Sequence, residues 1–389
     1  MAYACGELAN LCMVIDDAYA KATTTGKEKR QFFKSLVGVR RVDLPQDAVV
    51  WLEDATGNYR IISDLVGRPV EDRTPQGRLE WVVPPVQYAD QDVTQQTSGN
   101  IVRGLVRGLL AKHKDARKVG VITHRQHLHE LKLLEPYWNE RIARMDYFRS
   151  GNDRASNKWL DCDLLLILGT PRVPPSAVRE GLIQIGRIEE AGGDGQWGLI
   201  KWQGKITNRS SMGLIDAAPH SLPLVAGSGG PCGPPKQLLP PEVMTIEGRG
   251  YRDPSWAEVH NQIVRANLLQ AVGRGRGVRD RGIRVVVVSN EKLALPLISG
   301  EVPIIKDEVA RTFMALRKLT VKNPKYNTLG KMTVTTVQLA EQAGLSQEET
   351  RRHCNHLMTL GLLAKKGQRG GWSLNNETVD ENEGERGDE

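Results

Sequence analysis

Residues 268–291 of this sequence read LLQAVGRGRGVRDRGIRVVVVSNE. The first five residues have the composition of an apolar helix end, and the valines at 285–288 are typical of a buried strand because β-branched side chains pack well in sheets. The turn between them is a cluster of glycines and arginines: Gly273, Arg274, Gly275, Arg276, Gly277, Arg279 and Arg281. A helix that is followed by such a turn and then by a buried strand predicts an α/β fold.

Helices and strands are expected to alternate before this stretch as well. The predicted helices span 100–113, 125–138 and 255–273, and the predicted strands span 118–124, 144–148 and 161–171. The last of these, DCDLLLILGTP, has a continuously apolar centre, which is typical of a parallel strand covered on both faces. The sequence therefore predicts a doubly wound parallel sheet, whose functional groups should lie at the carboxyl ends of its strands.

The segments outside this pattern are less regular. Residues 6–22 have apolar positions at three- and four-residue steps and predict an amphipathic helix, whereas residues 48–52 predict a short buried strand. We expect a linker at 69–99. The region 192–252 is rich in glycine and proline, and we interpret it as a long insertion in the sheet domain that holds one hairpin, GQWGLIKWQGK at 195–205.

A third unit begins near Lys306 and has the layout of a winged helix-turn-helix. Helix 335–344 is followed by the turn GLS and a second helix, 347–361, whose start is marked by a capping box of Ser346 and Glu349. The hairpin LLAKKGQRGGWSL would form the wing. Five cations of this unit are candidates for contacts with DNA phosphates: Arg351, Arg352, Lys365, Lys366 and Arg369. A winged helix that binds another protein is the alternative.

The charge of the chain also favours a polyanionic partner. The net charge is +7 over 389 residues, although the tail from Glu377 onward holds seven carboxylates and one arginine, so the rest of the chain is still more basic. A body this basic indicates a nucleic-acid partner, with general solubility charge as the alternative. The acidic tail, 377–389, is expected to be disordered.

Cysteine and histidine usage argues against a metal site. The five cysteines are odd in number and never spaced C-x-x-C, which fits a reducing cytosol better than a disulfide framework or a cysteine zinc site. We interpret the HCNH run at 353–356 as a helix surface facing DNA or solvent, and His124, His127 and His129 as surface helix residues. No signal peptide or membrane span is recognisable, so we expect a cytoplasmic protein without a membrane partner.

Four segments resemble, in the correct order, motifs of superfamily 2 helicases. Among these helicases, they are most similar to the helicase halves associated with phage and plasmid primases. They are VVWLEDATGN (motif III), KVGVITHRQHLHEL (motif IV), RSGNDRASNKWLDCDLLLILGTP (motif V) and QAVGRGRG (motif VI). The resemblance covers residues 45–290, and motif VI is its most specific part. It implies that residues 1–80 are the end of a first RecA-like domain and that 81–300 are a second one, followed by the winged helix domain at 306–376.

The resemblance also implies roles for the residues of motif VI. ATP hydrolysis builds negative charge on the transferred phosphoryl group, and an arginine from a facing domain stabilises it. Arg274 and Arg276 are the candidates for this catalytic role, with Gln270 as a helper and Gly273 in the same nucleotide-facing turn. The family commonly carries its second arginine where this chain has Gly277.

Because of that departure, Arg276 or Arg279 must substitute for the family's second arginine. A glycine-rich turn whose arginines only cover a helix C-terminus, where cations are favoured, is the alternative. Among the other motifs, the resemblance implies that Asp54 and Thr56 of motif III lie on the nucleotide side of the site. The alternative for these two residues is a simple polar turn. Four residues are implied to contact nucleic acid, with a plain polar loop as the alternative for motif V: Thr123, Ser156, Asn157 and Thr170.

The chain has no phosphate-binding loop of the form G-x-x-x-x-G-K-[ST]. Asp16 and Asp17 follow an apolar run and could hold Mg²⁺ from a strand, but the helical spacing explains them better. We therefore expect ATP and Mg²⁺ to bind only together with a P-loop NTPase or primase partner. The sequence predicts the C-terminal portion of an ATP-dependent DNA helicase or translocase from a phage-like or mobile-element replication module. The alternative is a non-catalytic DNA-binding protein with a winged helix on a degenerate RecA-like scaffold.

Overall fold

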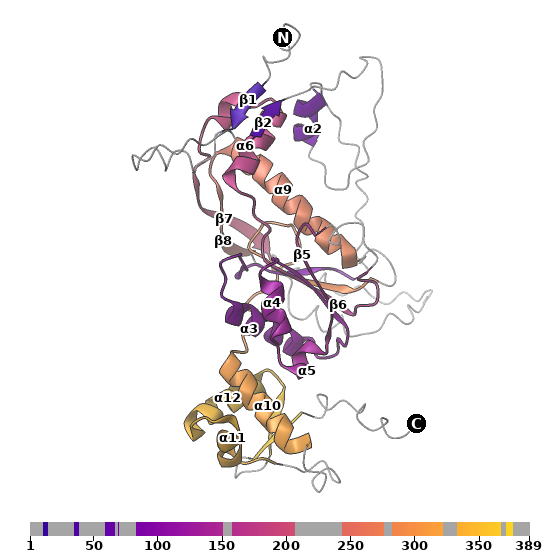
Figure 1. Cartoon of the computed structure of the whole chain (residues 1–389), viewed down its shortest axis with the longest axis vertical. Helices are drawn as coiled ribbons and strands as arrows, with labels where there is room; N and C mark the ends of the chain where they lie inside the picture. The colour runs from indigo at the N-terminus through magenta and orange to yellow at the C-terminus, as the bar shows by residue number, and fades with distance from the viewer. Residues whose placement is uncertain are drawn as a thin grey trace, which may run out of the picture. The chain divides into compact units, whose positions relative to one another are not determined.

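The computed structural model of the chain (Figure 1) describes residues 11–14, 35–38, 59–66, 69, 83–150, 158–206, 243–275, 282–321, 333–366 and 371–375. It contains a five-stranded parallel sheet flanked by helices, which confirms the predicted α/β class. The strand order is β3–β9–β6–β4–β5. These strands are β3 (Val86–Tyr88), β9 (Arg284–Val288), β6 (Leu164–Leu168), β4 (Val119–Thr123) and β5 (Ile142–Tyr147).

The described residues divide into two compact units that interleave along the sequence. The first unit holds the residues up to Asp92, those from Thr170 to Gly282 and those from Val287 to Ser299. The second holds 93–169, 283–286 and the residues from Gly300 onward. The domain boundaries expected near residues 80 and 306 stay predictions.

In the second unit, strands β4 and β6 lie in the centre of the hydrophobic core. Every residue of both strands is buried, and β4 pairs in parallel with β6 and with β5. Val121 is opposite Leu166 on one side and Met145 on the other. The strand LLLIL therefore lacks alternation because both of its faces are buried in a parallel sheet, as its sequence indicated.

Three helices accompany these strands. Helix α3 (Gly99–Lys112) confirms the predicted helix at 100–113. The single helix expected at 125–138 is instead two short ones, α4 (His127–Lys132) and α5 (Pro136–Asn139). Pro136 explains the break, because a proline disfavours helical backbone at the preceding residue and donates no backbone hydrogen bond.

Helix α3 packs very closely on the segment that leads into the C-terminal helices. The amide of Ile305 donates to the Gly104 carbonyl at 3.0 Å, and a Cβ atom on Gly108 would lie only 1.6 Å from the Pro303 carbonyl oxygen. Between the two glycines, the guanidinium of Arg107 is almost fully buried. It donates to both carboxylate oxygens of Glu135, at 2.9 and 2.7 Å, and to Asp307 at 2.7 Å.

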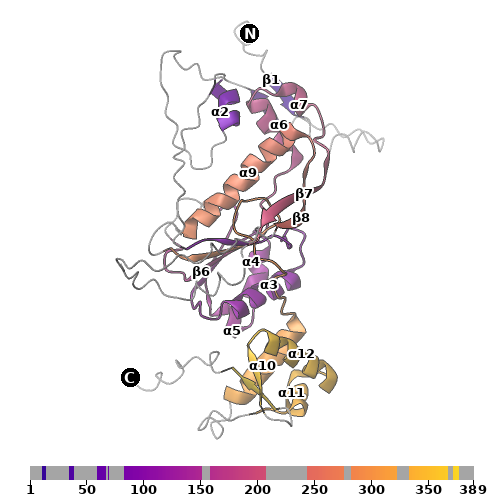
Figure 2. The ribbon, with the colours of Figure 1, turned by 180° about the vertical axis from the view of Figure 1, so that it is seen from behind.

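The C-terminal part of the second unit consists of three mutually packed helices and a hairpin (Figure 2). The elements are α10 (Asp307–Val321), α11 (Thr336–Ala343), α12 (Gln347–Thr359), β10 (Leu363–Lys366) and β11 (Gly371–Leu374). The capping box at the start of α12 is confirmed, since Ser346 accepts from the Glu349 amide and Glu349 accepts from the Ser346 amide. Gly344 and Gly361 have φ values of +67° and +70°, which suits glycine at a helix C-terminus. Sequence patterning located all of these elements except α10.

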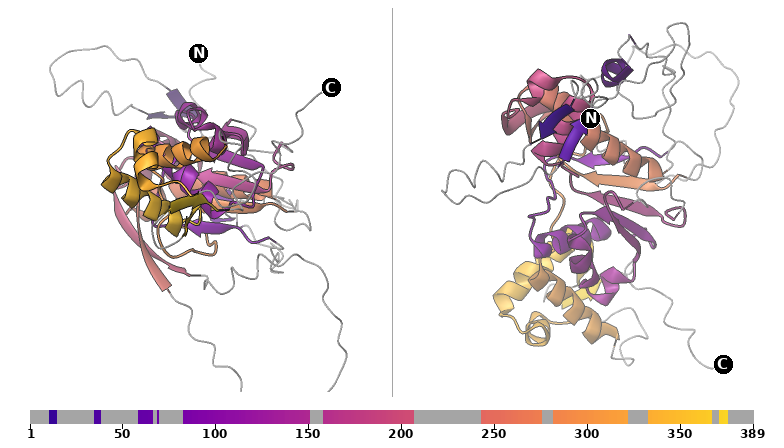
Figure 3. Two further views of the ribbon diagram at one scale, coloured as in Figure 1. Left: turned by 90° about the horizontal axis from the view of Figure 1, so that it is seen from below. Right: turned by 45° about the horizontal axis from the view of Figure 1, so that its top comes forward.

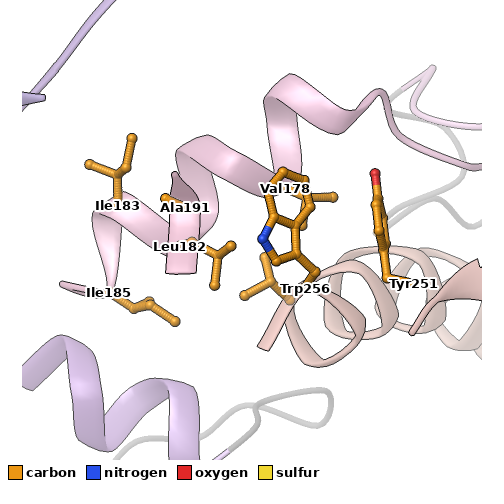
Figure 4. Packing of buried hydrophobic residues seen from close by; sticks show 8 residues of the cluster. Val178, Leu182, Ile183, Ile185, Ala191, Tyr251 and Trp256 are labelled. Atoms are coloured by element: carbon orange, nitrogen blue, oxygen red, sulfur yellow. The ribbon is translucent and has the colours of Figure 1, made fainter. Parts of the chain in front are cut away.

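In the first unit, helices α6 (Pro175–Gln184), α7 (Ile188–Ala191) and α9 (Pro254–Val272) pack against one another (Figure 3, right). Figure 4 shows their shared core, in which Trp256 of α9 lies among Val178, Leu182 and Tyr251. Asp253 caps α9 by accepting a hydrogen bond from the Trp256 amide at 3.0 Å. Helix α2 (Tyr59–Val66) lies beside this core, and its Asp64 pairs with Arg187.

Two of the predicted elements in this unit are wrong. Residues 195–205 do not form a hairpin by themselves. Instead, β7 (Trp197–Lys205) is one strand that pairs antiparallel with β8 (Val243–Tyr251) over nine residue pairs. The expected linker at 69–99 contains strand β3. The hairpin prediction failed because the partner strand lies far away in the sequence, in the glycine- and proline-rich region.

The helix expected at 6–22 is also wrong over the part that the structure describes. Residues Leu11–Val14 form strand β1, which pairs antiparallel with β2 (Ser35–Gly38). A short apolar run such as LCMV suits a strand as well as a helix, and only the partner strand decides between them. The strand predicted at 48–52 lies outside the described residues.

Candidate functional site

Helix α9 ends where the sequence places the arginine-rich turn. Its last residue is Val272, and Gly273–Gly275 form a single 3₁₀ turn. The side chain of Gln270 is half-buried, and no described residue forms a hydrogen bond with its buried amide oxygen. Gly273 is exposed, and no atom of the described residues lies within 4 Å of a Cβ placed on it, whereas Arg274 is half-buried. The helix end therefore has room and hydrogen-bonding capacity beside the candidate arginine.

Several of the other predicted site residues lie outside the described part of the chain. They are Asp54, Thr56, Ser156, Asn157, Arg276, Arg279 and Arg369, together with the side chain of Lys366. Of the three arginines considered for the catalytic role, Arg274 is thus the one that the structure places.

The two threonines expected to contact nucleic acid are buried. Thr123, at the end of β4, donates its hydroxyl hydrogen to the Leu168 carbonyl at 3.0 Å. The Thr170 hydroxyl, which follows β6, lies 2.8 Å from a carboxylate oxygen of Asp92 and 2.7 Å from the Ser289 hydroxyl. Both hydroxyls therefore support the fold in this conformation, and a nucleic-acid contact through either stays a prediction.

Thr170 belongs to a polar cluster of the first unit, which we call the carboxyl-edge cluster. Its members follow the ends of strands β3, β6 and β9 or lie within β3: Gln87, Asp92, Thr170, Arg172, Ser289, Asn290 and Glu291. Doubly wound sheets bind their ligands at this edge. The sequence alone pointed to Thr170 but assigned no role to Asp92, Arg172 or the SNE triplet.

The hydrogen bonds of the cluster form a directional chain. Thr170 donates to Asp92, so its oxygen accepts from the Ser289 hydroxyl, and the Ser289 oxygen in turn accepts from the Glu291 amide at 3.2 Å. The Gln87 side-chain amide donates to the carbonyls of Ser289 and Glu291, at 2.7 Å each. These bonds hold the segment after β9 in one conformation.

Arg172 is the cation of this cluster. Its Nη2 donates to Asp92 at 2.8 Å and to the Asn290 side chain at 3.1 Å. Its Nε–H is buried and has no acceptor among the described residues, and the same holds for the Nε–H of Arg265 on α9. Buried donors normally have partners, so these two positions mark where a water molecule or a ligand oxygen would complete the hydrogen bonding.

Glu291 is the most perturbed acid of the cluster. Burial raises its pKa to about 7, although the positive charges of Arg265 and Arg172 act in the opposite direction. The influence of Arg265 also shows that the middle of α9 passes near the carboxyl end of β9. A carboxyl group that titrates near neutral pH can hold or release a proton under physiological conditions.

Two histidines lie differently from the sequence prediction. His124 and His127 are not surface residues: both are buried and contact the backbone carbonyls of Val93 and Thr94, at 3.0 and 2.8 Å. His353 is half-buried, with its Nδ1 3.0 Å from the Thr312 hydroxyl on α10, and the predicted role of this helix surface in facing DNA or solvent stays a prediction. His129 is exposed as expected. The helical spacing did not reveal that residues 93–94 would contact and cover His124 and His127.

The cations predicted for DNA contact are accessible where the structure describes them. Arg351 and Arg352 are exposed on α12, and Lys365 is exposed on β10. The opposite face of α12 buries Cys354 and Leu357 in the core. The arginines therefore contribute nothing to core packing, and their side chains can reach a polyanion.

Among the described residues, no group of three or more His, Cys, Asp and Glu side chains could hold a metal ion. The helices of the described ranges include none that is long and apolar enough to cross a membrane. Comparison of the chain with protein-family models, with curated proteins and with solved structures finds no match. The functional argument therefore depends on the residues of the chain itself.

Proposed function

We propose that this chain is the C-terminal part of an ATP-dependent DNA helicase or translocase of a phage-like or mobile-element replication module. In this proposal the parallel-sheet region is a second RecA-like domain, and another protein segment or partner supplies the phosphate-binding loop. The observation that carries the proposal is the end of α9, where the amide oxygen of Gln270, which has no hydrogen-bond partner among the described residues, is followed by the turn with Arg274. This is the order of groups in the helicase motif that faces a nucleotide.

ATP would supply the free energy of its hydrolysis at the interface with that partner. The residues of this chain fit one side of such a site, since Gln270 can accept or donate a hydrogen bond and an arginine stabilises phosphoryl charge. The other side is missing from the sequence, which has no P-loop. We therefore assign this chain the role of providing charge and orientation, and assign the binding of Mg²⁺ to the partner.

The three C-terminal helices and the β10–β11 hairpin would act as a winged helix that binds DNA. Their order of helix, glycine turn, capped helix and hairpin supports this assignment. Exposed cations on α12 and β10 support it further, because phosphate contacts provide most of the affinity for DNA.

A second function, DNA binding without catalysis, is favoured by the buried hydroxyls of Thr123 and Thr170. In this alternative the sheet is a scaffold and the winged helix alone is active. The two proposals share DNA as the partner and differ in whether Arg274 affects ATP turnover once a P-loop partner is present.

The DNA-binding part is tested with the full chain and fluorescein-labelled duplex DNA over a series of salt concentrations. We expect R351A/R352A to reduce the slope of log K against log salt by about 1.8, because each lost phosphate contact removes about 0.9. The matched control is R117A/K132A, which removes two exposed cations from other positions. Equal slopes for all three proteins would contradict DNA binding by α12.

The catalytic part is tested by ATP turnover in the presence of single-stranded DNA. The isolated chain should not hydrolyse ATP, because it lacks a phosphate-binding loop. Steady turnover by the isolated chain would overturn the proposal. When a P-loop partner restores turnover, R274A should lower it by about 10³-fold if this arginine stabilises the phosphoryl charge. Unchanged turnover would favour the non-catalytic alternative for this residue.

A further inference from the structure

The paired strands β7 and β8 form a two-stranded ribbon with two different faces (Figure 3, left). Burial alternates strictly along β7, and the exposed positions of β8 lie opposite those of β7 in the register. We call the exposed side the outer face. It consists of Trp197, Leu199, Lys201, Gln203, Lys205, Val243, Thr245, Glu247 and Arg249.

The other side of the ribbon anchors it to the first unit. Trp202 donates its indole N–H to the Asn290 carbonyl at 3.0 Å, and Ile246 is buried in a cluster with Leu297. Gly204 allows this approach, because a Cβ at this position would lie 2.3 Å from a Leu297 methyl carbon. The ribbon is therefore held from its inner side, and on its outer face the positions from Leu199 to Lys205 and from Val243 to Arg249 are exposed.

The outer face combines a large aromatic ring with positive charge. Trp197 is 40% exposed and Leu199 is 61% exposed, which are high values for side chains of this size. Arg249 lies opposite Leu199 in the register, and Lys205 lies at the end of the same face. Lys201 forms an ion pair with Glu247 at 2.7 Å, whereas Lys205 and Arg249 have no carboxylate partner among the described residues.

The ring of Trp197 is also fixed in orientation. It makes edge contacts with Tyr251, at 4.8 Å between ring centroids, and with His260, at 5.3 Å. Both of these residues are buried. Burial lowers the pKa of His260 to about 4, so this ring is neutral at neutral pH and adds no charge behind the tryptophan. A partner that stacks on Trp197 would thus lose little side-chain entropy in ordering it.

We infer that the outer face of the β7–β8 ribbon binds single-stranded nucleic acid, with a base stacked on Trp197 and backbone phosphates contacting Lys205 and Arg249. This inference deepens the proposed function and rests on its nucleic-acid partner. Aromatic stacking combined with cations is how single strands are bound without sequence preference. A duplex would not suit the site, because its bases are already stacked on one another. Polar and charged side chains separate Trp197 and Leu199 from Val243 at the other end, so the face has no large continuous apolar patch and a protein partner is less favoured than a polyanion.

The test measures binding of the full chain to a fluorescein-labelled oligothymidylate over a series of salt concentrations. We expect K205A/R249A to weaken binding and to lower the salt slope by about 1.4, because each phosphate contact with a single strand contributes about 0.7. The matched control R117A/K132A also removes one arginine and one lysine, and it should retain the slope. Duplex binding should be affected by R351A/R352A and not by K205A/R249A.

Two further variants test the stacking and the charge separately. Replacing Trp197 by Leu should weaken oligothymidylate binding about tenfold, whereas replacement by Phe should largely preserve it. Glu247→Gln should tighten binding and raise the salt slope, because it releases Lys201 from its ion pair. Circular dichroism and the melting temperature show whether each variant is folded.

The outcomes separate this inference from the proposed function. If ribbon variants bind oligothymidylate like the wild type while R351A/R352A still weakens duplex binding, the inference is wrong and the proposed function stands. If Glu247→Gln weakens binding, the outer face does not contact phosphates. If the wild type binds neither DNA at low salt, the proposed function itself fails. If the outer face binds a protein instead of DNA, and the Leu199→Glu variant loses that binding, the inference is also wrong.

Discussion

The buried carboxyl group of Glu291 gives a quantitative prediction about stability. This side chain follows β9 in the carboxyl-edge cluster and is 8% exposed. Its backbone amide and carbonyl are bonded to Ser289 and Gln87, but no described residue donates a hydrogen bond to its carboxylate. Replacing Glu291 by Gln keeps the size of the side chain and removes the ionisation, so the variant isolates the energetic effect of the charge.

The magnitude follows from the pKa. Burial raises it from 4.5 to about 7, so the folded state holds the proton more tightly than the unfolded state does. The stability that this group contributes is fully present below pH 4.5 and is lost as the pH rises through 7. At 1.36 kcal/mol per pH unit, the loss amounts to about 3 kcal/mol. The Glu291→Gln variant should therefore match the wild type near pH 4.5 and exceed its free energy of unfolding by up to about 3 kcal/mol at pH 8.

The assay is urea unfolding of the wild type and the variant at a series of pH values between these limits. The difference between the two proteins cancels the titration of all other groups. Glu189→Gln is the control, because Glu189 is an exposed acid of the same unit and should show no such difference. A difference that stays constant with pH, or a variant that is less stable at pH 8, would refute the reasoning about Glu291.

Three further substitutions test the packing of the second unit. Arg107→Met should destabilise it by about 1–3 kcal/mol in urea unfolding, because Glu135 loses its two hydrogen bonds to the buried guanidinium and Asp307 keeps only its pair with Arg103; a loss below about 0.5 kcal/mol would contradict this. Gly108→Ala should lower the melting temperature and cost about 1–3 kcal/mol, since the new Cβ would overlap the Pro303 carbonyl, and an unchanged melting temperature would show that the contact is absent. Ser346→Ala should cost about 1 kcal/mol because it removes the capping box of α12, and hydrogen exchange in this helix should become faster. Unchanged exchange would contradict this prediction.

The elements that sequence patterning located correctly are those whose patterns have one physical cause. The buried strand LLLIL has no alternation because both of its faces are covered, and the helix before the arginine-rich turn has a proline start and a glycine end. The capping box at Ser346 is a local interaction of four residues. Each of these signals is complete within a short stretch of sequence.

The features that patterning did not locate depend on distant residues. The sequence of β7 has the alternation of a strand, but its partner β8 begins 38 residues after β7 ends, at Val243. Strand β1 is decided by pairing with β2, and His124 is buried because residues near Val93 cover it. Long-range pairing is not encoded in local periodicity, so a local pattern alone does not determine these features.

The candidate site was predicted in the same uneven way. Thr170 follows a buried strand, and the carboxyl end of such a strand is where functional groups are expected. Asp92 lies in the stretch 69–99, which has no periodicity and for which the sequence predicts a linker, so no local pattern points to it. The elevated pKa of Glu291 depends on burial by several segments, which no local pattern contains.

The salt dependence of duplex binding by the unmodified chain tests the central claim most directly, since the claim is that this protein acts on DNA. The claim predicts that log K falls linearly with log salt. The magnitude of the slope should be at least about 2.7, because the exposed cations Arg351, Arg352 and Lys365 each contribute about 0.9. A chain that binds duplex DNA with no salt dependence, or that does not bind it at low salt, would contradict the claim.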